Sequence, residues 1–169
     1  MGKNPERREA LKAVLSRLLL GFLPALVGCT MSLLLGGVAM SGMSWSVLQL
    51  GMLLLWFWAG YRLSGGRLGL WKSAAVVHLP ALAALLAALF QILVLERWWQ
   101  NLAGGLSQVF FAPFFLPAVS LLRLFPWSGN LWGLFLAAFT VMFAAFCLGG
   151  AVKIILKKRQ GVSHDQSSH

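Results

Sequence analysis

The chain has 169 residues, of which 59% are hydrophobic, and its formal net charge is +10. Such an apolar composition excludes an ordinary soluble domain. The basic residues flank long apolar runs, so they indicate membrane orientation rather than nucleic-acid binding.

Residues 1–17 are polar and basic and are predicted to form an amphipathic segment that runs into the first membrane span. Asn4, Pro5 and Glu6 have the pattern of a helix start: an N-cap, a proline at the first helical position and an acid in the first turn. Apolar runs of about 20 residues then match the roughly 30 Å hydrocarbon core of a bilayer. The predicted spans are residues 18–40, 45–63, 73–95 and 131–156, followed by a disordered tail at 157–169.

Residues 96–130 are the least regular apolar segment. Gly104 and Gly105 interrupt it, and Pro113 and Pro117 remove helical hydrogen-bond donors from its middle. We therefore predict that this segment lies at the outer face, either as an interfacial helix or as a shallow re-entrant hairpin.

The distribution of charge favours a topology in which residues 96–130 do not cross. Of the 14 Lys and Arg residues, all except Arg97 and Arg123 then lie on the side of the two termini. By the positive-inside rule, both termini are predicted to be cytoplasmic, in a single all-α membrane domain of four helices in a bacterial cytoplasmic membrane. Aromatic residues expected at the inner boundary are Trp56, Trp58, Tyr61 and Trp71.

Small residues recur every fourth position in several spans, which allows two helices to approach closely. The sequence leaves open whether these faces pack within the monomer or dock a partner subunit. The candidate helix-packing residues are Gly28, Ser32, Gly36, Ala84, Ala88, Gly133 and Ala137.

His78 is the single histidine within a predicted span, which makes it a candidate functional group. The spans contain no carboxylate to work with it, so a neutral imidazole bonded to a backbone carbonyl is the alternative interpretation. Gln49 is a candidate for an interhelical hydrogen bond. Cys29 and Cys147 form no ligand cluster and are expected to be small buried hydrophobes. We therefore predict no catalytic residue, no metal and no cofactor.

Arg62, Arg67 and Lys72 surround a glycine-rich loop and are candidates for contact with an anionic lipid head group, or serve only as orientation charges. The stretch AGYRLSGGRLGLWK at residues 59–72 resembles the loop after the second span in small four-span membrane proteins of Firmicutes, a family of unknown function. The resemblance implies four spans and no activity, and this chain departs from it through the long segment 96–130.

These observations predict a non-enzymatic accessory or interaction subunit, with the bilayer and a membrane protein or a second copy of itself as partners. The alternative is a small homo-oligomeric transporter or channel component for an apolar or amphipathic substrate.

A topology reporter tests the arrangement of the spans. A reporter fused after Arg159 is expected to read as cytoplasmic, because four crossings return the chain to the side of its N-terminus. An extracytoplasmic reading would show that residues 96–130 also cross the membrane.

Overall fold

The computed structural model describes residues 5–37, 42–65, 68–95, 102–124 and 130–166. Within these ranges every regular element is helical, which confirms the all-α prediction. The elements are α1 (Pro5–Gly21), α2 (Leu23–Gly37), α3 (Gly42–Leu63), α4 (Gly69–Leu93), α5 (Leu102–Phe111), the 3-10 turn η1 (Ala112–Phe114), α6 (Phe115–Leu122) and α7 (Leu131–Gln166).

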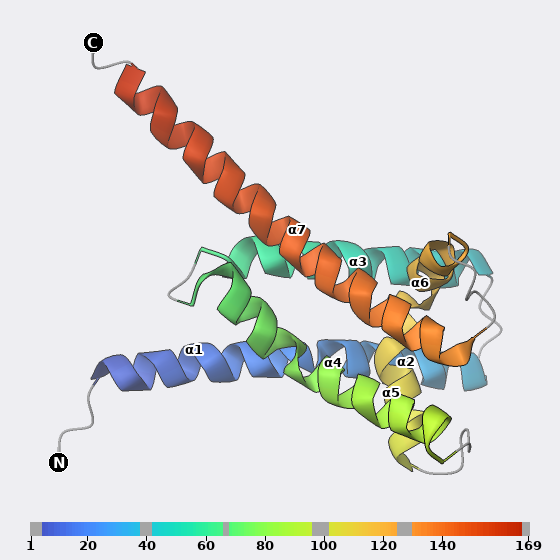
Figure 1. Cartoon of the computed structure of the whole chain (residues 1–169). Coiled ribbons are helices and arrows are strands. Elements are labelled where there is room, and N and C mark those ends of the chain that lie inside the picture. The colour runs from blue at the N-terminus through green and yellow to red at the C-terminus, as the bar shows by residue number, and fades with distance from the viewer. Residues whose placement is uncertain (1–4, 38–41, 66–67, 96–101, 125–129, 167–169) are drawn as a thin grey trace.

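The first helix begins at Pro5 with Glu6 in its first turn, as the sequence predicts. It is interrupted near Phe22, because Pro24 has no N–H to continue the helical ladder. The first predicted span is therefore two helices, α1 and α2, which continue in nearly the same direction (Figure 1).

Among the described residues, four helical stretches are long and apolar enough to cross a membrane: residues 6–34, 69–93, 104–122 and 131–160. The number agrees with the prediction, but the set differs. It includes residues 104–122, and it leaves out α3, where polar residues such as Gln49 dilute the leucines. With 22 residues, α3 is nevertheless about 33 Å long, enough to cross a bilayer.

The arrangement in space separates these two elements (Figure 1). The combined helix α1–α2, α3, α4 and α7 each run between two ends of the molecule. We call the end where α1 begins and α7 ends the terminal end, and the opposite one the distal end. The segment α5–η1–α6, which we call the hairpin, stays near the distal end instead.

The depth of this hairpin follows from its contacts. Its turn, η1, is bonded to Gln49, which lies roughly 10 Å along α3 from the distal end. The turn contacts both α2 and α3, α5 packs against α2 and α4, and α6 packs against α7. The segment 102–122 is therefore embedded among the spans rather than lying across their ends.

Two helices differ from the prediction in shape. Pro80 lies inside α4, and the helix bends along its length (Figure 1). The helix α7 has 36 residues, so it is about 54 Å long and exceeds a bilayer core. The tail predicted to be disordered from residue 157 is helical up to Gln166, as a continuation of the last span.

The centre of the fold is the crossing of α3 and α7. Gly60 lies against the backbone carbonyl of Phe146, and Gly149 lies against that of Phe57. A Cβ atom at either glycine would collide with the opposing backbone. Beside this crossing, Trp56 is 0% exposed and contacts the ring of Phe114 from the hairpin turn. The close crossing therefore places the hairpin against the core of the bundle.

The α3–α7 crossing predicts a specific sensitivity to added volume. Gly60→Ala should destabilise the protein by about 1–3 kcal/mol, because the new methyl group meets backbone atoms that cannot move independently. Gly51→Ala is the matched control in the same helix, since its added Cβ would meet no neighbouring helix or side chain within 4 Å. Thermal unfolding in detergent measures both variants, and equal melting temperatures would contradict the close crossing.

Candidate functional site

The most buried polar contact links α3 to α4. The indole Nε1–H of Trp56 donates a hydrogen bond to Nε2 of His78 at 3.2 Å. Since Nε2 accepts, the ring proton is on Nδ1, which lies 2.8 Å from the carbonyl oxygen of Ala74 and donates to it. His78 is 3% exposed and uses both ring nitrogens in these bonds. The geometry is that of a neutral, structural imidazole.

Aromatic rings surround this imidazole. Phe143 and Phe146 place their centroids 5.0 Å and 5.3 Å from that of His78, with steep interplanar angles. Phe139 lies at 6.2 Å. All three come from α7, so His78 connects three helices through one ring. Edge-to-face packing of this kind stabilises the bundle and leaves the imidazole in apolar surroundings.

A second buried polar contact attaches α1 to α4. Arg17 is 6% exposed, and its Nε donates to the hydroxyl oxygen of Ser73 at 3.1 Å. Its Nη1 donates to the carbonyl oxygen of Ala13 at 2.9 Å. Gly21, one turn later, lies against the carbonyl of Val77. Arg17 was predicted as an orientation charge of the N-terminal segment, and it also fastens that segment to the bundle.

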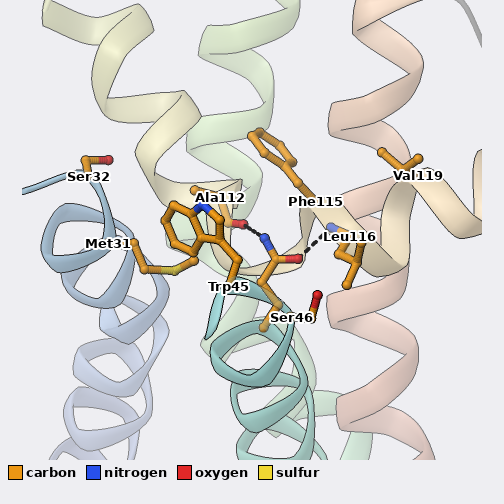
Figure 2. A pocket seen from close by; sticks show the side chains of 9 residues that line it. Met31, Ser32, Trp45, Ser46, Ala112, Phe115, Leu116 and Val119 are labelled. Carbon is orange, nitrogen blue, oxygen red and sulfur yellow. Dashed lines mark hydrogen bonds between the residues drawn. The ribbon is translucent and has the colours of Figure 1, made fainter. Parts of the chain in front are cut away.

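The side chain of Gln49 replaces a backbone hydrogen bond that is missing at the hairpin turn. In a regular helix the N–H of Leu116 would bond to the carbonyl of Ala112, but the N–H of Phe115 takes that carbonyl in a 3-10 bond instead. The side-chain amide of Gln49 bonds to both groups, and dashed lines mark these two bonds in Figure 2. Its Nε2 donates to the Ala112 oxygen at 3.0 Å, and its Oε1 accepts from the Leu116 N–H at 2.8 Å.

A cleft of about 530 Å³ opens beside this amide, between α2, α3 and the hairpin. Figure 2 shows Trp45 and Met31 to one side of the Gln49 bonds, and Leu116 and Val119 to the other. A mainly apolar cleft with a few polar groups is the usual form of a site for a small apolar molecule. The remaining lining residues are Ser32, Ser46, Gln49, Ala112 and Phe115.

Comparison with family models, with curated proteins and with solved structures finds no match to this chain. The resemblance of residues 59–72 to the Firmicutes proteins therefore stays a prediction. The assignment of a site rests on the geometry of this chain.

The predicted helix-packing residues occupy different surroundings. Gly28 lies against the backbone of Val109 in α5, so its missing side chain serves the hairpin. Ser32 lines the cleft beside Gln49, which we call the distal cleft. Gly36 lies in the part of α2 whose side-chain surroundings the structure does not describe. The others pack towards the core of the monomer: Ala84, Ala88, Gly133 and Ala137.

The candidates for head-group contact around the α3–α4 loop lie in different surroundings, and their role stays a prediction. The guanidinium of Arg62 lies 5.5 Å from the ring centroid of Trp58, Lys72 is exposed on α4, and Arg67 lies outside the described residues. Lysines of α7 lie beside the loop, and Lys153 bonds to the carbonyl of Arg62. Sequence patterns do not indicate this pairing, because the lysines are about 90 positions away and their approach depends on the crossing of α3 and α7.

Two expectations about single residues need correction. Cys29 is exposed on α2 rather than buried, and Cys147 is partly buried. Trp56 is enclosed in the core instead of lying at the inner boundary, because it bonds to His78. Across the described ranges, His, Cys, Asp and Glu form no group of three that could hold a metal ion.

Removing the Gln49 amide should loosen the hairpin. Gln49→Leu leaves the Leu116 N–H and one acceptor site of Ala112 without partners, at a cost on the order of 2 kcal/mol. Hydrogen exchange should accelerate at Leu116 and its neighbours in α6. Thr140→Val is the matched control, because its hydroxyl bonds within its own helix on the exposed face. Unchanged exchange in Gln49→Leu would show that the amide does not hold the turn.

Proposed function

We propose that this protein is a non-enzymatic accessory or interaction subunit of a membrane complex, with α1–α2 as its contact surface. The observation that carries the proposal is the exposure of this helix pair. Of the residues in its most apolar stretch, 17% are buried, against 39%, 44% and 39% in the other three apolar helical stretches. A span that packs so little on its own protein leaves a broad face for a neighbouring helix.

The use of polar side chains supports a structural rather than a catalytic role. His78, Gln49 and Arg17 each form a hydrogen bond that connects two elements of the fold. None of these bonds leads to a nucleophile or an acid–base pair in a cleft. The small residues at Gly28 and Ala88 face other parts of the same chain, so the partner surface is assigned to the exposed leucines of α1–α2 instead.

The proposed location is a bacterial cytoplasmic membrane, with several crossings and both termini in the cytoplasm. The beginning of α1 and the end of α7 lie towards the same end of the molecule (Figure 1), and each of these two helix segments carries several basic residues. The positive-inside rule assigns such an end to the cytoplasmic side.

The distal cleft supports a second candidate function, a small transporter component for an apolar or amphipathic substrate. Its volume of about 530 Å³ falls in the range of small-molecule sites. A path across the membrane would require several copies of the chain, because buried hydrophobic side chains around Trp56 fill the interior of its own bundle.

Site-specific photocrosslinking in native membranes distinguishes the two functions. A photoreactive residue at position 26 replaces Leu26, which is 67% exposed on α2, and the control replaces Leu54, which is 60% exposed on α3. Both positions lie roughly 17 Å from the distal ends of their helices. We expect position 26 to capture one different protein, which also co-purifies in stoichiometric amount with the C-terminally tagged chain, and position 54 to capture lipid.

Two results would contradict the accessory-subunit proposal. Capture of further copies of this chain as a defined oligomer would favour the transporter function. Capture of a different protein at position 54 alone would place the partner on the α3–α7 side, and would remove the assigned role of α1–α2.

A further inference from the structure

A basic cleft of about 510 Å³ lies at the terminal end, where α3 ends beside α7. Two parts of the chain line it: the start of the α3–α4 loop and the turns of α7 that follow the crossing with α3. The lining residues are Ser64, Gly65, Lys153, Ile154, Lys157 and Lys158.

Lys153 is held in place within this cleft. Its Nζ donates to the carbonyl oxygen of Arg62 at 3.0 Å and lies 5.7 Å from the ring centroid of Tyr61. Gly65 makes room for it, since a Cβ there would lie 2.6 Å from Nζ. An ammonium group that is already fixed loses little further side-chain entropy when it binds an anion.

The other two lysines supply positive charge that no described residue neutralises. Lys157 follows Lys153 by one helical turn, so both project from the same side of α7. Neither Lys157 nor Lys158 forms a hydrogen bond or ion pair with the described residues, and no carboxylate is among the residues described around the cleft. Like charges at this spacing repel each other, and a bound anion would relieve the repulsion.

The surroundings identify the source of the anion. Ile154 lines the cleft and is exposed, as is the adjacent Ile155, so apolar side chains of α7 border the lysines. Trp58 and Tyr61 lie on the neighbouring turns of α3, and amphipathic rings of this kind settle at the head-group level. A phosphate group with an acyl chain beside it matches this border of charge and apolar surface.

We propose that this cleft binds the phosphate group of an anionic phospholipid. The three lysines contact the phosphate oxygens, and Ile154 contacts the upper part of the acyl chain. The site lies at the opposite end from the distal cleft and is independent of the α1–α2 surface.

Native mass spectrometry of the full-length protein in neutral detergent tests the proposal. The probes are dioctanoyl phosphatidylglycerol, dioctanoyl phosphatidylcholine and inorganic phosphate, each titrated separately and then in competition. We expect one phosphatidylglycerol per chain, with both other probes at least about tenfold weaker. Lys157→Gln with Lys158→Gln should weaken phosphatidylglycerol by tenfold or more.

The matched control is Arg7→Gln with Arg8→Gln, which removes the same charge from exposed positions at the same end of the molecule. It should change the affinity by no more than about twofold, since these residues lie outside the cleft. Equal losses in the two double variants would replace the cleft with diffuse surface charge and overturn the proposal. Inorganic phosphate that binds as tightly as phosphatidylglycerol, and displaces it, would overturn the lipid as the source of the anion.

Discussion

A polar group among membrane helices has no water to bond, so its partner must come from the protein. Three contacts of the bundle follow from this constraint. Arg17 joins α1 to α4, the Trp56–His78 pair joins α3 to α4, and Gln49 joins α3 to the hairpin. Apolar packing alone gives little preference between lipid and protein inside a bilayer. These hydrogen bonds therefore select which helices are neighbours.

The hairpin shows how the constraint is met where the sequence breaks a helix. Proline at positions 113 and 117 removes two backbone donors, and the 3-10 turn between them leaves the Leu116 N–H without its helical acceptor. The Gln49 amide presents an acceptor and a donor in one plane, and so replaces the missing backbone pair. A leucine at position 49 would suit the apolar surroundings of α3 but not the backbone of the hairpin.

The sequence predicts the helical class and the approximate positions of the long helices, because long charge-free runs and glycine-proline breaks report directly on local structure. It does not predict which distant residues meet. Trp56 has the composition signal of an interfacial aromatic, yet its bond to His78 places it in the core. From the sequence, Lys153 is one of the basic residues that set the orientation, whereas the α3–α7 crossing places it at the carbonyl of Arg62. Both cases depend on helix packing, which local patterns do not encode.

The distal cleft is a consequence of the same constraint. The turn η1 contacts both α2 and α3 and holds them apart, and its position is fixed by Gln49 on one side and by the approach of Gly28 to α5 on the other. To close the cleft, η1 would have to move and give up both hydrogen bonds of the amide. The cleft is therefore preformed. A molecule that binds there does not incur the free-energy cost of opening it.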